Sequence, residues 1–96
     1  MKRNVLITGA AGFIGAATIK KFILNGDNVV GVDNLCPYYD VSLKKNRLKE
    51  IDNLSLEKIR WHFYENSLQD YQSLSNIFKK HKPDIVINLA AQAGVR

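Results

Sequence analysis

The feature that most constrains the fold of this chain is a glycine-rich segment close to its first residue, Thr8–Gly15 (TGAAGFIG). It follows an apolar run, Val5–Ile7, and it opens a second apolar-periodic stretch that extends from Phe13 to Leu24. An apolar run that passes through glycines directly into a periodic stretch predicts a buried strand that turns sharply into a helix.

A unit of this kind can bind a pyrophosphate. The missing side chains let the backbone approach, and free N–H groups at the start of the helix face the anion. The spacing is Gly9-x-x-Gly12-x-x-Gly15, which differs from the plain dinucleotide pattern. A P-loop is excluded because Ala16 and Ala17 stand where that motif needs Lys and Ser or Thr. The alternative is a tight turn that binds nothing.

An acidic residue follows at the distance at which a dinucleotide site needs one. Asp33 ends the next apolar run, Val29–Val32, and lies 18 residues after Gly15. A carboxylate at the end of a second strand can accept hydrogen bonds from an adenosine ribose. Its charge would repel a 2′-phosphate, and the next residues are Asn34 and Leu35 rather than arginine, so the pattern favours NAD over NADP. The alternative is an aspartate that only stabilises a turn.

The rest of the chain continues this alternation. Hydrophobic periodicity and helix-capping residues predict strands over 4–8, 29–33, 59–64 and 85–89 and helices over 12–25, 42–54 and 71–82. The third strand is expected near an edge and the fourth to be buried on both faces. Asn25-Gly26 is expected to end the first helix, Asp70 to cap the third, and Pro83 to stop it. The expected inward residues are Ile14, Ala17, Phe22 and Ile23 on the first helix and Leu43, Leu48 and Ile51 on the second.

The alternation predicts an α/β fold with a parallel sheet. In a Rossmann-type doubly wound sheet the first three strands have the order 3-2-1, and the fourth lies on the other side of the first, which gives 3-2-1-4. Ligands bind where the strand order reverses, at the carboxyl ends of the strands. Gly9–Gly15 and residues 90–96 are both expected there.

Composition excludes several classes of protein. At 96 residues the chain forms one small domain at most, and its single cysteine, Cys36, excludes an intramolecular disulfide and fits a reducing compartment. We find no signal peptide and no apolar run near the ~20 residues of a membrane span, so we expect a cytoplasmic protein with no membrane partner. The net charge of +5 is dispersed over expected helix surfaces, so we expect no nucleic-acid partner.

The chain resembles the N-terminal part of the extended short-chain dehydrogenase/reductases, in the nucleotide-sugar epimerase and dehydratase family. The resemblance rests on the glycine fingerprint 8–15, on Asp33-Asn34 and on Asn88–Ala91, and it covers all 96 residues. Within the family, the loops 33–40 and 89–96 are most similar to those of the UDP-glucuronate 4-epimerases.

The resemblance implies NAD as cofactor, a nucleotide-sugar substrate and a homodimer for the complete protein. It implies oxidation of the sugar at C4, rotation of the 4-keto sugar and return of the hydride to its other face. At position 67 the family has an aspartate near the adenine, whereas Ser67 can accept a hydrogen bond but has no charge. The implied NAD-binding residues are Gly9, Ala11, Gly12, Phe13, Ile14, Gly15, Asp33, Asn34, Ser67, Leu68, Leu89, Ala90 and Ala91.

The catalytic pair of this family, Tyr-x-x-x-Lys, has no match here. The residues four positions after Tyr38, Tyr39, Tyr64 and Tyr71 are Ser, Leu, Leu and Ser. We therefore name no catalytic and no metal-ligating residue. We interpret residues 1–96 as part of an NAD-binding Rossmann domain, without the rest of that domain or a sugar-binding domain, and expect them to be inactive alone.

Other interpretations stay open. The chain could be part of a nucleotide-sugar 4,6-dehydratase or of a UDP-glucose 4-epimerase, and the sequence after Arg96 would distinguish these. It could also be a nucleotide-binding module without chemistry of its own. A basic nucleic-acid binder is the remaining alternative, and it would show salt-dependent binding to DNA or RNA.

Overall fold

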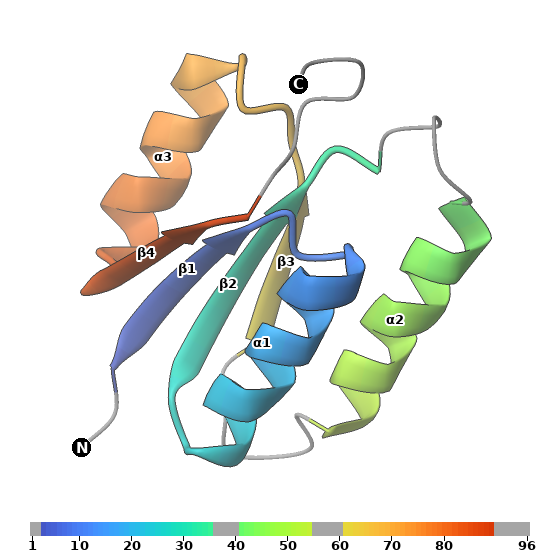
Figure 1. Cartoon of the computed structure of the whole chain (residues 1–96). Helices are drawn as coiled ribbons and strands as arrows, with labels where there is room; N and C mark the ends of the chain where they lie inside the picture. Colours follow the sequence, from blue (N-terminus) through green and yellow to red (C-terminus); the bar gives the residue numbers. More distant parts are fainter. Residues whose placement is uncertain (1–2, 36–40, 55–60, 90–96) are drawn as a thin grey trace.

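Strands and helices alternate along the chain. The structure is a computed structural model that describes residues 3–35, 41–54 and 61–89. The described elements are β1 (Asn4–Thr8), α1 (Phe13–Leu24), β2 (Asn28–Asp33), α2 (Val41–Leu54), β3 (Trp61–Glu65), α3 (Tyr71–His81) and β4 (Ile85–Asn88) (Figure 1). The strands form one parallel sheet in the order β3-β2-β1-β4. The predicted α/β fold and strand order are confirmed, and the order reverses between β1 and β4.

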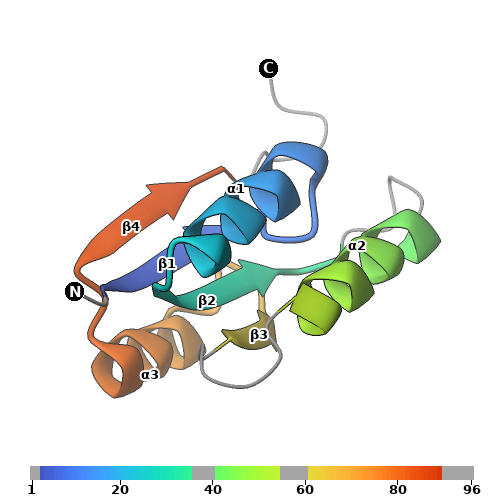
Figure 2. The ribbon, with the colours of Figure 1, turned by 90° about the horizontal axis from the view of Figure 1, so that it is seen from below.

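The helices lie on both faces of the sheet. Helices α1 and α2 cover one face, and α3 covers the other (Figure 2). Side chains alternate along β1 accordingly: Val5 and Ile7 pack in the cluster under α1 and α2, and Leu6 packs in the cluster under α3. The first cluster is the larger, with Val5, Ile7, Ala10, Ala16, Ile19, Ile23, Val29 and Ile51 as its buried members. The core therefore lies mainly between the sheet and α1.

The buried side of α1 differs from the one predicted. Ile23 is buried as expected and Phe22 packs against the core, but Ile14 is 64% exposed and Ala17 is also exposed. The residues buried instead are Gly15, Ala16 and Ile19. Helix α1 is rotated so that Gly15 faces the turn that precedes it, and this constraint outweighs the burial of Ile14.

Helix α2 shows a second difference from the prediction. Ile51 is buried and Leu48 packs against the core, as expected. Leu43, however, is 52% exposed, and its neighbour Lys44 is buried. The lysine lies inward because an acidic partner is there, as described below.

The predicted helix ends are confirmed. Gly26 has φ +92°, and its N–H donates to the Ile23 carbonyl at 2.9 Å, which ends α1 in the left-handed conformation that glycine favours. At α3, Asp70 Oδ1 accepts the Ser73 N–H at 3.2 Å. Lys82 then ends α3 with φ 45°, directly before Pro83.

The two outer strands have different surroundings. The predicted third strand is present as β3 from Trp61 onward. Positions 59–60, where it is expected to begin, lie outside the described residues. In β4, Ile85 and Ile87 pack against the core under α1, but Val86 is 49% exposed. Burial of both faces is expected for this strand in a complete sheet; in the described residues the Val86 face is open, because the cluster under α3 is built on β1 and β2 and does not include β4.

Strand β3 is joined to α2 through a tryptophan. The indole of Trp61 lies over Gly31, where an added Cβ would be 2.6 Å from the Trp61 Cη2 atom. The indole N–H then donates to Asp52 Oδ1 of α2 at 2.7 Å. A glycine in the middle of β2 thus makes room for the side chain that fixes α2 against the sheet.

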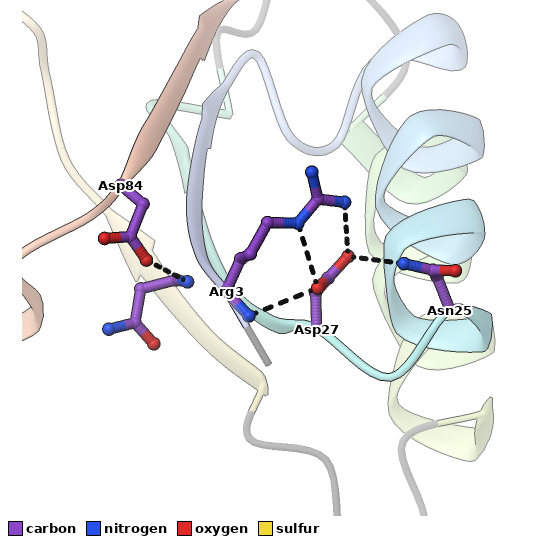
Figure 3. A network of polar contacts seen from close by, with 5 residues as sticks. Arg3, Asn25, Asp27 and Asp84 are labelled. Atoms are coloured by element: carbon purple, nitrogen blue, oxygen red, sulfur yellow. Dashed lines mark hydrogen bonds and ion pairs between the residues drawn. The ribbon is translucent and has the colours of Figure 1, made fainter. Parts of the chain in front are cut away.

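A buried carboxylate connects β1 to the loop after α1, at the amino ends of the strands (Figure 3). Asp27 is completely buried, and its Oδ1 accepts hydrogen bonds from the Arg3 main-chain N–H at 3.2 Å and from Arg3 Nε at 3.3 Å. Its Oδ2 accepts from Arg3 Nη2 and from Asn25 Nδ2, both at 3.1 Å. These bonds, above all those from the Arg3 side chain, lower the pKa of Asp27 from its ordinary value.

Asp27→Asn should destabilise the protein by about 1–3 kcal/mol at pH 7, because charged hydrogen bonds at a buried site are lost. Since the pKa of Asp27 is lowered in the folded state, its stabilisation is complete above the unfolded-state value of about 3.9 and is lost as the pH falls through the folded-state pKa. Urea unfolding of both proteins between pH 7 and pH 2 should therefore show a difference that shrinks below about pH 4.

Asp84→Asn is the matched control. Asp84 lies at the same edge of the sheet and is exposed, and its Oδ2 accepts a hydrogen bond from the Asn4 N–H at 2.9 Å (Figure 3). Because asparagine keeps an oxygen acceptor, this variant should change stability by less than about 0.5 kcal/mol. Equal losses in the two variants, or a loss for Asp27→Asn that stays the same at every pH, would contradict the assignment.

Candidate dinucleotide-binding site

The glycine turn places the start of α1 at the carboxyl end of β1. Gly9 has φ 71°, a left-handed conformation that glycine adopts without strain. Its carbonyl accepts the Gly12 N–H at 3.1 Å, and Gly12 is the N-cap of α1, where it has no side chain to cap the first N–H groups of the helix. The first turn of α1 carries no acidic side chain. Uncapped N–H groups and the positive end of the helix dipole favour an anion at this position.

The three glycines of the turn have different physical roles. At Gly15, an added Cβ would lie 2.0 Å from the Gly9 carbonyl oxygen and 2.9 Å from its carbon, so the helix can lie this close to the turn only without a side chain there. At Gly12, the one atom of the described residues within 4 Å of an added Cβ is the Gly9 oxygen, at 3.2 Å. Gly15 therefore serves the packing of α1, whereas the missing side chain of Gly12 leaves space for a ligand outside the backbone.

Asp33 binds the turn to the end of β2. It is 6% exposed, and its Oδ2 accepts the Ala11 N–H at 3.0 Å. Its Oδ1 accepts the Leu35 N–H at 2.7 Å. The Ala10 N–H donates to the Val32 carbonyl at 3.2 Å, next to this contact. The structure thus brings the predicted acid into direct contact with the predicted glycine turn.

Two basic residues of α2, Lys44 and Arg47, also contact Asp33 or the glycine turn, and the sequence analysis did not identify them as site residues. Lys44 Nζ lies 3.4 Å from Asp33 Oδ1, and the lysine side chain is 11% exposed. Arg47 Nη1 donates to the Ala11 carbonyl at 3.1 Å, and its guanidinium lies 5.9 Å from the centre of the Phe13 ring. The sequence predicts that the basic residues of this helix lie on a solvated surface, and this prediction is wrong for Lys44. Their spacing of three residues, which puts both on one helix face, is the pattern that could have indicated a shared site.

The end of β4 meets the turn from the other side. Thr8 Oγ1 donates to Asn88 Oδ1 at 2.5 Å, and the Leu89 N–H donates to the Thr8 carbonyl at 3.2 Å. The predicted site residue Leu89 is thereby placed at the carboxyl end of β1, where the strand order reverses. The predicted site residues Ala90 and Ala91 lie outside the described residues, as do Cys36 and positions 37–40.

The residues predicted after β3 are less closely joined to the turn. The Asn66 N–H donates to the Asp33 carbonyl at 3.1 Å, which connects this loop to β2. Ser67 is exposed, and its hydroxyl accepts the Gln69 N–H at 3.1 Å. Leu68 packs against the cluster under α3. Of this pair, therefore, only Ser67 presents a side chain to the surface.

The predicted residues at the start of α1 are open to solvent. Phe13 is 77% exposed and Ile14 is 64% exposed, and Asn34 at the end of β2 is also exposed. Apolar side chains beside uncapped N–H groups and a buried carboxylate fit a ligand that combines flat apolar rings, phosphates and hydroxyl groups. The described residues contain no group of three potential metal ligands, and none of their helices is long and apolar enough to span a membrane.

A cavity lies at the opposite edge of the sheet, where the strands begin. It has a volume of about 390 Å³, and its lining includes His62, Lys80 and His81. Burial, together with the charges of His62 and Lys80, lowers the pKa of His81, and its Nε2 is 2.7 Å from the Tyr64 hydroxyl. None of the residues predicted to bind a cofactor lines this cavity, so the two features can be distinguished by experiment.

Comparison with known proteins agrees with this geometry. The sequence model of the family described as GDP-mannose 4,6 dehydratase matches residues 6–96. Protein CapI of Staphylococcus aureus is 48% identical over 95 residues, which are 97% of this chain and 26% of that protein. The UDP-glucuronate 4-epimerase of Thermodesulfobacterium geofontis is 43% identical over 91 residues, which are 95% of this chain and 27% of that protein.

Solved structures share the fold. The UDP-glucose-4-epimerase of Stenotrophomonas maltophila, with bound NAD and formylated UDP-arabinopyranose, has a TM-score of 0.76 at 29% identity, over 97% of this chain and 26% of that one. The UDP-glucose 4-epimerase of Bifidobacterium longum, in complex with NAD+ and UDP, has a TM-score of 0.73 at 25% identity. The match covers 93% of this chain and 24% of that one. The chain spans about a quarter of the length of these relatives.

The different roles of Gly15 and Gly12 predict different effects of the same substitution. Gly15→Val should destabilise the protein by about 3 kcal/mol or more, because its Cβ would overlap the Gly9 carbonyl. Gly12→Val should cost less, about 1–2 kcal/mol, because the backbone at Gly12 (φ −72°, ψ 168°) suits valine and the added Cβ would press on the Gly9 oxygen only at 3.2 Å. Thermal and urea unfolding of both variants check this. A Gly12→Val variant as unstable as Gly15→Val would show that Gly12 is only a packing residue.

Proposed function

Because the chain belongs to the GDP-mannose 4,6 dehydratase family, we propose that it forms the NAD-binding part of a nucleotide-sugar 4-epimerase. The observation that carries this proposal is the contact between Asp33 and the glycine turn. It places a carboxylate for ribose hydroxyls beside uncapped helix N–H groups for a pyrophosphate. Together the two groups suit the adenosine ribose and the adjacent pyrophosphate of a dinucleotide.

Each part of the site has a distinct task in this proposal. The backbone from Gly9 to Gly15 binds the pyrophosphate, and the missing side chain of Gly12 lets the phosphates approach. Asp33 accepts hydrogen bonds from the adenosine ribose. Phe13 and Ile14 provide apolar surface at the opening, and the end of β4 forms the border of the site on the side of Leu89. These residues would hold NAD, which would supply the acceptor and donor of a hydride for the sugar.

NAD rather than NADP is the proposed cofactor. The buried carboxylate of Asp33 lies where a 2′-phosphate would bring further negative charge, and its two oxygens are already oriented by main-chain N–H groups. The presence of NAD in the two solved epimerases described above supports this choice.

We propose UDP-glucuronate as the substrate, with UDP-galacturonate as the product through a 4-keto sugar. Support comes from the similarity to the named UDP-glucuronate 4-epimerase and from the loops at 33–40 and 89–96. The family name and the solved structures also support the two alternatives, a 4,6-dehydratase and a UDP-glucose 4-epimerase. Residues 1–96 contain no Tyr-x-x-x-Lys, so their proposed task is to bind and orient the cofactor, not to transfer protons.

The cofactor assignment predicts the effect of two substitutions on binding. Asp33→Ala should weaken NAD about tenfold or more, since charge-assisted hydrogen bonds contribute about 1.5–3 kcal/mol. Gly12→Val should abolish NAD binding although the variant stays folded. Calorimetric titration of the protein that the gene encodes checks both, with Asp84→Ala at the opposite edge of the sheet as a control that should bind normally. Unchanged NAD affinity in Asp33→Ala would contradict the assignment.

The proposed reaction is tested by product analysis. The protein, as its gene encodes it, is incubated with NAD and with UDP-glucuronate, UDP-glucose or dTDP-glucose in separate reactions, and the products are separated by chromatography. We expect UDP-galacturonate from the first. Exclusive formation of UDP-galactose, or of a 4-keto-6-deoxy sugar nucleotide, would establish one of the alternatives instead. No turnover of any substrate, together with NAD binding, would favour a nucleotide-binding module.

A further inference from the structure

The site contains a buried lysine to which the proposed function gives no task. Lys44 comes from α2, its side chain is 11% exposed, and its Nζ lies 3.4 Å from Asp33 Oδ1. Asp33 already accepts main-chain N–H groups from Ala11 and Leu35. Its orientation therefore does not require the lysine, and a buried ammonium group carries a desolvation cost that needs a reason.

The charges around the glycine turn are not balanced by Asp33 alone. Lys44 lies beside the carboxylate, and Arg47 lies one helical turn further along α2, with its guanidinium on the Ala11 carbonyl. The uncapped start of α1 adds partial positive charge at the same place. Among the described residues, removal of the negative charge of Asp33 would take away the carboxylate that contacts Lys44, and Lys44, Arg47 and the helix N-terminus would then present more positive charge to a phosphate.

We propose that Lys44 is a specificity-determining residue for the cofactor, a phosphate-binding cation that Asp33 neutralises. This inference rests on the proposed function, because it concerns the same dinucleotide site. With Asp33 present, the lysine is paired and the carboxylate repels a 2′-phosphate, so NAD is preferred. Without that carboxylate, Lys44 becomes a partner for the 2′-phosphate of NADP. The preference for NAD is therefore a property of the Asp33–Lys44 pair and not of Asp33 alone.

Arg47 has a different task. Its Nη1 is held by the Ala11 carbonyl at 3.1 Å, and its guanidinium lies over the Phe13 ring. It thus joins α2 to the glycine turn and is engaged whether or not Asp33 is charged. Lys44 is the cation in direct contact with the Asp33 carboxylate, so replacement of Asp33 removes that contact from Lys44, and for this reason the inference concerns Lys44.

The chain offers a matched control next to this residue. Lys45 is exposed on the same helix, so Lys45→Met removes the same charge one position away. Methionine retains most of the length of the lysine stem and lacks only the ammonium group. Asp33→Asn removes the charge of the carboxylate and keeps an oxygen that can accept one of the two main-chain hydrogen bonds.

The experiment measures the dissociation constants of NAD and NADP by calorimetry for the protein that the gene encodes and for its variants. In the unsubstituted protein, NAD should bind more tightly than NADP. In Asp33→Asn, the affinity for NADP relative to NAD should rise by at least about tenfold, since a charge-assisted contact is gained. Asp33→Asn/Lys44→Met should lose that gain, and Asp33→Asn/Lys45→Met should keep it. The gain should also shrink as salt concentration rises.

A second measurement does not depend on the folding of Asp33→Asn. With Asp33 in place, Lys44→Met leaves the carboxylate without its cation, so discrimination against NADP should increase several-fold. Lys45→Met should not change it. Circular dichroism and thermal melts of every variant show which of them are folded, and only the folded ones enter the comparison.

The outcomes separate this inference from the proposed function. NADP binding by Asp33→Asn/Lys44→Met as tight as by Asp33→Asn would overturn the role of Lys44 and leave the NAD site intact. An unchanged ratio of NADP to NAD affinity in Lys44→Met, relative to the unsubstituted protein, would also overturn the role of Lys44 and leave the NAD site intact. Failure of the unsubstituted protein to bind either dinucleotide would overturn the proposed function and this inference with it.

Discussion

The close contact between Gly15 and the carbonyl group of Gly9 is the constraint on which the rest of the site depends. An added Cβ at Gly15 would lie 2.0 Å from that oxygen, so the absence of a side chain sets how near α1 comes to the end of β1. The same contact sets the rotation of α1, with Ala16 and Ile19 inward and Ile14 outward. It also places the uncapped helix start at the carboxyl edge of the sheet, where a phosphate can reach it.

Recognition of the dinucleotide then depends on how β2 and α2 are fixed relative to this turn. Asp33 connects them, because it accepts the Ala11 N–H of the turn and pairs with Lys44 of α2. Helix α2 is held in turn by Trp61, whose indole lies over Gly31 and donates to Asp52. Gly15 and Gly31 therefore have related effects. Gly15 lets α1 approach the turn, and Gly31 lets Trp61 lie over β2 and hold α2, the helix that carries Lys44.

Much of this arrangement could be predicted from the sequence. Local patterns were sufficient for the end of α1 at Gly26 and for the cap at Asp70, because each depends on a residue with a special backbone or capping preference. The strand order followed from the alternation of strands and helices together with the rule for doubly wound parallel sheets. The inward face of α1 and the burial of Lys44 could not be predicted in this way. Both result from contacts between segments distant in sequence, which override the preference of apolar side chains for the core. The exposure of Val86 likewise reflects where α3 packs, not the composition of β4.

The central claim is that the glycine turn and the end of β2 form one dinucleotide site. Its most direct test is amide chemical-shift mapping by NMR during titration of the protein with NAD. We expect the largest changes on Gly9–Gly15 and on Asp33–Leu35, with none at the cavity that His62 and His81 line. Changes confined to that cavity, or dispersed changes with none at the turn, would contradict the account.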